Sequence, residues 1–181
     1  ICWCSSDEPE RLGQLKRAVE GIYDLARSYG TPFISGKDSM FNDFKGFDEN
    51  GQPVKVSAPP TLLTSSIGVI DDVMNAISIV PKAVGDLVYI LGETKDECGA
   101  SEYYDHMGYT GNNAPEVDAD KAKLLYKCYT KAARKNLIAS GMAVGFGGIA
   151  ATLAKKSIAG QMGIEVDLGK LGSELRSDKL L

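Results

Sequence analysis

The chain has 181 residues, of which 44% are hydrophobic and 24% are charged, and its formal net charge is -4. This balance is typical of a globular protein with an apolar core, and the length fits one large domain or two small ones. The acidic charge and the lack of a dense Lys/Arg stripe argue against a nucleic-acid-binding protein, and no apolar run is long enough to span a membrane.

The cysteine and histidine content argues against a zinc site or a disulfide framework. Cys2 and Cys4 are too close in sequence for an ordinary disulfide within a strand, and neither Cys98 nor Cys128 completes a zinc-binding pattern with them. We therefore expect reduced thiols. His106, the only histidine, has no Ser, Cys or Asp pattern near it and is interpreted as a loop residue and not as a catalyst.

The first half of the chain predicts a helix, a buried strand, a hairpin and a second strand. Residues 5–9 combine capping side chains with a proline, which is typical of a helix start, and apolar residues then recur at helical spacing until Gly30. We expect a short buried strand over residues 31–34, a tight turn at Asn50-Gly51 and a strand over residues 61–70.

The second half predicts a strand, two helices and a final strand. These elements are a strand over residues 87–91, a polar loop over 92–116, a helix capped by Asp118, a glycine-rich turn into a helix over 149–156, and a strand over 162–168. The order of elements favours two α+β parts, with a boundary near Val80-Pro81 that gives domains 1–80 and 81–181.

The stretch Ser35–Met40 is the strongest candidate for a binding site. Gly36, at the end of the expected buried strand, would let the backbone approach a ligand, and Lys37, Asp38 and Ser39 then offer a cation, a carboxylate and a hydroxyl. Ligands commonly bind where strands end, and this set of groups suits a phosphate-bearing ligand. The glycine spacing excludes a Walker A loop, and an ordinary polar turn is the alternative.

Three further features are weaker candidates. Gly145–Gly148 precedes a helix, where free N–H groups attract anions, but a turn for close packing is an equal alternative. The loop from Glu93 to Tyr104 could line a polar substrate site, although a solvated loop is the commoner structure. Asp71 and Asp72 are expected to cap the next segment and not to bind a metal.

Six stretches occur in an order that is more informative than any one of them. They are Cys2–Cys4, Gly30–Ser39, Ala58–Leu63, Ile67–Asp72, Leu91–Thr94 and Gly99–Tyr103. Together they resemble the second of the two repeated halves of the phosphoribosylformylglycinamidine synthase family, and the resemblance runs through nearly the whole chain. It implies that the chain is an internal piece of such an enzyme and is inactive on its own.

The resemblance implies a fold similar to aminoimidazole ribonucleotide synthetase. Residues 1–80 would be part of an N-terminal domain that adds strands to a shared β-barrel, and residues 81–181 would be part of a C-terminal α/β domain. The implied activity is that of a cytoplasmic, ATP-dependent ligase of purine biosynthesis. Such an enzyme phosphorylates the amide oxygen of formylglycinamide ribonucleotide to an iminophosphate, which glutamine-derived ammonia displaces, while Mg²⁺ neutralises the nucleotide phosphates.

The same resemblance implies partners for this chain. They are the ribonucleotide substrate, a glutaminase domain or subunit, the other half of the same enzyme, and a second copy of this piece, since exposed barrel edges favour pairing. Neither a nucleic acid nor a membrane is expected among them.

The resemblance also implies roles for individual residues. Gly36 matches a position close to the nucleotide, and Ser39 matches one that contacts the ribonucleotide substrate. Lys37 stands where one branch of the family has a magnesium-binding Asn, and because an ammonium cannot ligate a metal, Lys37 is expected to contact the nucleotide phosphates directly. Asp38 is expected to orient Lys37 or to contact the substrate. No catalytic residue and no metal ligand is expected in this chain.

The stretch Gly141–Gly148 departs from the family pattern. Met142 and Ala143 stand where the family usually has a His-Asp pair, so a metal–nucleotide site built on that Asp would be lost or altered. This departure favours an alternative in which the region is a non-catalytic pseudo-repeat that completes the barrel or docks the glutaminase. A third hypothesis is another superfamily member, such as a selenophosphate synthetase or a thiamine-phosphate kinase, and the Ser-Gly-Lys-Asp-Ser and Gly-Glu-Thr stretches count against it.

Overall fold

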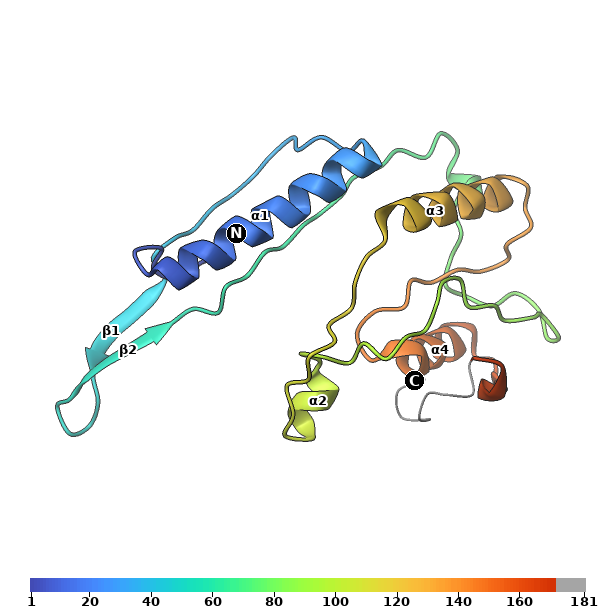
Figure 1. Ribbon diagram of the computed structural model, residues 1–181. Helices are drawn as coiled ribbons and strands as arrows, with labels where there is room; N and C mark the ends of the chain where they lie inside the picture. The colour runs from blue at the N-terminus through green and yellow to red at the C-terminus, as the bar shows by residue number, and fades with distance from the viewer. Residues whose placement is uncertain (172–181) are drawn as a thin grey trace. The chain divides into compact units, whose positions relative to one another are not determined.

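The computed structural model describes residues 1–171, and the chain divides after Val69 into two compact units. The first unit holds α1 (Pro9–Tyr29) and an antiparallel hairpin of β1 (Asp43–Phe47) and β2 (Pro53–Ser57) (Figure 1). The second unit begins at Ile70 and holds α2 (Glu102–His106), α3 (Ala119–Arg134), α4 (Gly148–Gly160) and the short 3-10 helices η1 (Val73–Asn75) and η2 (Leu168–Lys170). Helices together with a two-stranded sheet confirm the expected α+β class.

The helix α1 begins and ends close to the predicted positions. Pro9 lies in its first turn, and Gly30 ends it in the left-handed conformation, with φ 71° and its N–H donating to the carbonyl of Ala26 at 2.9 Å. The expected capping does not occur, because the N-cap residue is Glu8, whose side chain makes no capping hydrogen bond. Prediction from local chemistry therefore succeeds for the bounds of α1 and fails for its cap.

The hairpin confirms the turn predicted at Asn50-Gly51. Its register runs from Asp43 opposite Ser57 to Phe47 opposite Pro53. One carboxylate oxygen of Asp48 accepts hydrogen bonds from the N–H groups of Asn50 at 2.9 Å and Gln52 at 2.8 Å. Gly51 has φ 74°, a conformation that glycine adopts without strain, so the turn is fixed by residues within it.

The predicted strands do not form among the described residues. Residues 31–34, 61–70, 87–91 and 162–168 are irregular, apart from an isolated bridge at Thr61 and the start of η2 at Leu168. The first of these segments is not buried either, since the side chains of Phe33 and Ile34 are 58% and 82% exposed. A strand needs a neighbouring strand for its hydrogen bonds, and none of these apolar segments pairs along its length with a described neighbour.

Other expected elements need smaller corrections. His106 is the last residue of α2 and not a loop residue, because Ser101 caps a short helix inside the polar loop. The helix after the glycine-rich turn ends at Gly160 and not near Lys156. Asp118 caps α3 as predicted, its carboxylate accepting from the N–H of Lys121 at 3.0 Å, and Asp72 likewise caps η1.

The described part of the chain buries few apolar side chains. Among the described residues the buried hydrophobic side chains are Trp3, Cys4 and Ile149. Apolar side chains of both units are thus available for further packing, and the contribution of strands to a shared barrel stays a prediction.

In the second unit, residues 77–82 pack against α4 and Gly141. The N–H of Gly141 donates to the carbonyl of Ser78 at 3.0 Å. A Cβ added to Gly160, at the end of α4, would lie 2.7 Å from Cδ of Pro81, so the glycine allows this close approach. The predicted division at residues 80 and 81 stays a prediction about the domains of the longer protein, and its second part extends beyond the described residues.

Candidate functional site

The loop Gly36–Ser39 is anchored by the segment Ile1–Trp3. The N–H of Ser39 donates to the carbonyl of Ile1 at 3.0 Å, and the carbonyl of Ser39 accepts from the N–H of Trp3 at 2.8 Å, so the two segments pair in parallel. On the other side of the segment Ile1–Trp3, Cys2 pairs with Thr61 in antiparallel fashion through two hydrogen bonds of 2.9 Å. Residues 1–3 therefore lie between the candidate loop and Thr61.

Asn42 fixes the C-terminal end of the loop with its side chain. Its carboxamide oxygen accepts from the hydroxyl of Ser39 at 3.0 Å, and its Nδ2 donates to the carbonyls of Ser39 at 2.9 Å and Trp3 at 3.0 Å. Sequence reasoning missed this residue. The signal was the spacing Ser-x-x-Asn, which allows an Asn side chain to reach back to the preceding turn.

Trp3 connects the loop to α1. Its indole is 3% exposed, and its Nε1–H donates to the carbonyl of Arg11 in the first turns of the helix at 3.0 Å. Cys4 beside it is 1% exposed. The segment that pairs with the loop is thus followed by, and contains, the buried hydrophobic side chains of the first unit.

The remaining loop residues are exposed. A Cβ added to Gly36 would meet no atom within 4 Å, so the backbone is open on that side. The ammonium of Lys37 donates to the backbone carbonyl of Asp38, and in the described residues the Asp38 carboxylate forms no ion pair with it. Gly36, Lys37, Asp38 and Ser39 follow one another in this segment, with the first three exposed and Ser39 half-buried, and their binding roles stay predictions.

A charge cluster joins the hairpin to the start of α1. The ammonium of Lys55 contacts the carboxylate of Glu8 and lies 3.9 Å from Oδ2 of Asp43. The hydrogen bond with Glu8, more than the charge of Asp43, raises the pKa of Lys55 above its ordinary value. The side chain of Asp43 is 4% exposed, and its Oδ1 has no hydrogen-bond partner among the described residues.

The polar loop of the second unit is folded rather than extended into solvent. The N–H of Gly99 donates to the carbonyl of Asn113 at 2.8 Å, and that of Ala100 donates to the carbonyl of Thr110 at 2.7 Å. A Cβ on Gly99 would lie 2.6 Å from the backbone carbon of Asn113, so only glycine allows the contact. These bonds close the loop around α2.

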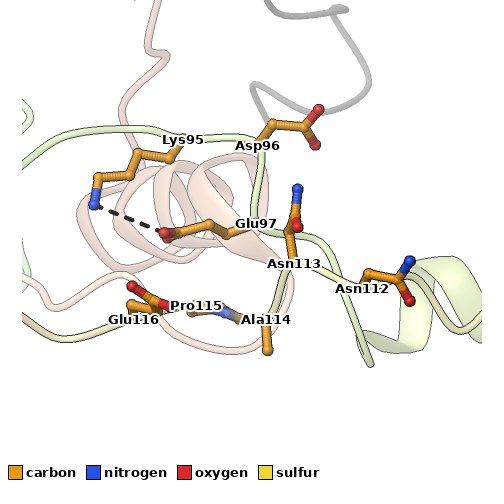
Figure 2. A pocket seen from close by; sticks show the side chains of 8 residues that line it. All are labelled: Lys95, Asp96, Glu97, Asn112, Asn113, Ala114, Pro115 and Glu116. Atoms are coloured by element: carbon orange, nitrogen blue, oxygen red, sulfur yellow. Dashed lines mark ion pairs between the residues drawn. The ribbon is translucent and has the colours of Figure 1, made fainter.

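Residues 95–97 and 112–116 of this loop line a hollow of about 490 Å³ (Figure 2). Figure 2 shows the side chains of Lys95 and Glu97 pointing toward each other, with Nζ and Oε1 3.7 Å apart. Asp96 and Glu116 add two further carboxylates to the lining. Because negative charge outweighs positive charge here, the hollow does not suit a phosphate-bearing ligand.

The glycine-rich turn supports the packing interpretation. Gly147 and Gly148 both have positive φ, 85° and 66°, and a Cβ on Gly147 would lie 2.5 Å from that of Ala151. The N–H of Gly148 already donates to the carbonyl of Gly145 at 3.0 Å. The turn therefore needs its glycines in order to enter α4, whether or not an anion binds there.

The described residues offer little for metal binding. No group of three or more His, Cys, Asp or Glu side chains within residues 1–171 could hold a metal ion, and all four cysteines are free. In the same part of the chain, no helix is both long and apolar enough to cross a membrane.

Sequence comparison identifies the family. The domain described as "AIR synthase related protein, C-terminal domain" matches residues 83–180, which is more than half of the chain. The chain belongs to the AIR synthase related family. This membership confirms an AIR synthase-like fold at the level of the family. No solved structure matches the chain.

Relatives of this family member carry the name expected from the sequence. Three of them are phosphoribosylformylglycinamidine synthase subunits PurL, from Pyrobaculum aerophilum, Methanocaldococcus jannaschii and Thermobifida fusca. They are 36%, 31% and 32% identical to it over 98%, 97% and 91% of this chain, and the matched regions are 24%, 24% and 21% of the relatives. The resemblance is thus confirmed, and the chain spans about a quarter of the length of these relatives.

Proposed function

We propose that this chain is part of a ligase that converts formylglycinamide ribonucleotide, ATP and glutamine-derived ammonia to formylglycinamidine ribonucleotide. In this proposal the loop Gly36–Ser39 forms one wall of the active site. The observation that carries it is the match to PurL subunits over nearly the whole chain. Because the chain spans about a quarter of those relatives, the reacting groups would come mainly from the rest of the longer protein.

The loop has groups suited to a phosphate-bearing ligand. The exposed ammonium of Lys37 uses one donor on the carbonyl of Asp38, which leaves two donors for phosphate oxygens. The open side of Gly36 would allow the nucleotide to approach the backbone. ATP would phosphorylate the substrate amide oxygen, and ammonia would then displace the phosphate, so Lys37 would act by holding negative charge.

The hydroxyl oxygen of Ser39 would accept a hydrogen bond from the ribonucleotide. Its hydroxyl hydrogen is used on Asn42, so the lone pairs of the oxygen are left for an O–H or N–H group of the substrate. Asn42 would then act as a positioning residue, because it holds both the hydroxyl and the carbonyl of Ser39.

The positions that the family resemblance links to magnesium provide no ligand in this chain. Mg²⁺ prefers oxygen ligands, but Lys37 has only N–H donors, and Met142 and Ala143 provide no side-chain oxygen. Any Mg²⁺ that the ligase uses would be held by the nucleotide and by other parts of the longer protein.

The test is ammonia-supported release of phosphate by the longer protein with formylglycinamide ribonucleotide and ATP. We expect Lys37→Ala to lower kcat/KM by about two orders of magnitude, or about 2.7 kcal/mol of barrier. Lys45→Ala is the matched control, because Lys45 is an exposed lysine of the same unit on β1. Lys37→Arg should recover part of the activity, since it keeps the charge.

A second function has one observation in its favour. Met142 and Ala143 stand where the family usually has His-Asp, which suits a non-catalytic half that completes a barrel or docks the glutaminase. That function predicts near-wild-type turnover for Lys37→Ala. Such a result would replace the active-site proposal with a scaffold and place the chemistry in the other half of the longer protein.

A further inference from the structure

Two lysines of the second unit converge on one place in the fold. Lys156, on α4, donates from its Nζ to the hydroxyl oxygen of Ser140 at 2.7 Å and to the carbonyl of Ile79 at 3.2 Å. Lys82 donates from its Nζ to the hydroxyl oxygen of Ser78 at 2.8 Å. The hydrogen bond from Gly141 to the carbonyl of Ser78 brings the two serine-bearing segments side by side.

These two positive charges are not neutralised by the described part of the protein. Within residues 1–171, no carboxylate forms an ion pair with either ammonium. Partial burial, followed by the charge of Lys82, lowers the pKa of Lys156 below its ordinary value. Two like charges held near each other cost free energy, and a bound anion would offset that cost.

The free hydrogen-bonding groups at this place are donors. Both serine oxygens accept from a lysine, and among the described residues neither hydroxyl donates a hydrogen bond, so both O–H hydrogens are available to a ligand. Lys82 uses one of its three donors and Lys156 uses two, which leaves three ammonium hydrogens. A site of five donors suits a ligand that only accepts hydrogen bonds and carries negative charge, and it excludes a cation.

We propose that Ser78, Lys82, Ser140 and Lys156 form a binding site for a phosphate group, either free or as the ester of a small molecule. The site lies in the second unit and shares no residue with the loop Gly36–Ser39. It therefore does not depend on the proposed ligase activity.

The test is calorimetric titration of the 181-residue chain with inorganic phosphate at constant ionic strength. We expect saturable binding to one site, weakened at least about tenfold by Lys156→Met and by Lys82→Met. Lys155→Met is the matched control, because Lys155 is the neighbouring exposed lysine on the same helix. The phosphate affinity of this variant should stay within about twofold of that of the wild type. No saturable binding by the wild type, or equal weakening by Lys155→Met, would overturn the site.

A second measurement keeps the test decisive if a variant does not fold. With ¹³C-labelled lysine in the wild-type chain, added phosphate should shift the NMR signals of Lys82 and Lys156 and leave that of Lys155 unchanged. Uniform shifts across all lysines would mean general ionic attraction and would contradict the proposal. Titration with ribose 5-phosphate distinguishes a phosphate ester from free phosphate as the ligand. Tighter binding than that of inorganic phosphate assigns the site to a phosphate ester, and weaker binding assigns it to free phosphate.

Discussion

The two units bury their side chains by different means. In the first, Trp3 and Cys4 are buried where residues 1–3 pair with Ser39 and Thr61, so order depends on backbone hydrogen bonds between distant segments. In the second, Ile149 and Thr152 are buried on α4, and neighbouring segments approach at glycines. The first unit should therefore be sensitive to lost hydrogen bonds and lost anchors, and the second to added volume.

The largest expected effect is on the anchor of the first unit. Trp3→Ala should lower the free energy of unfolding of that unit by about 3–5 kcal/mol, because it removes a buried aromatic side chain and leaves a cavity. Chemical denaturation followed by hydrogen exchange at Ser39 would measure it. Phe33→Ala is the control, since Phe33 is 58% exposed, and an equal loss there would contradict the role of Trp3 as an anchor.

The next effect tests the glycine contacts of the second unit. Gly99→Ala should destabilise this unit by about 1–3 kcal/mol, because its Cβ would lie 2.6 Å from a backbone atom of Asn113 that cannot rotate away. Gly163→Ala should change stability little, since a Cβ there meets no atom within 4 Å. Denaturant unfolding of both variants gives the comparison, and similar values would mean that close approach does not limit the second unit.

A smaller effect is expected for the side chain that holds the candidate loop. Asn42→Ala should destabilise the first unit by about 1–2 kcal/mol, because it removes hydrogen bonds to Ser39 and Trp3. Amide exchange at Ser39 should speed up accordingly. Asn112→Ala, at an exposed position of the second unit, should leave both readouts near wild type.

The smallest effect concerns pH. The pKa of Lys55 is raised, so as pH rises above 10.5 the unfolded chain loses this proton before the folded chain does. The stabilising contribution of the Lys55 ammonium is thus fully present below pH 10.5 and is lost as pH rises through the pKa of Lys55 in the folded chain. Lys55→Met should remove this alkaline loss from the unfolding free energy, whereas Lys45→Met on the same hairpin should keep it.

The sequence by itself determined those features whose partners lie within a few residues. Gly30 ends α1, Asp118 caps α3, and Asn50-Gly51 forms the hairpin turn, because each uses hydrogen bonds that span one turn of chain. The ordered motifs also predicted the family that comparison then identified. Local hydrogen bonding and the order of motifs can both be read from the sequence without knowledge of tertiary contacts.

Only the tertiary structure decided which distant groups meet. The apolar segments at residues 31–34 and 61–70 have the composition of strands, but a strand exists only where a partner accepts its hydrogen bonds. Asn42 reaching Trp3, 39 residues away, and Lys156 reaching Ile79, 77 residues away, left no periodic signal in the sequence. Such contacts depend on how the chain returns on itself, which local propensity does not encode.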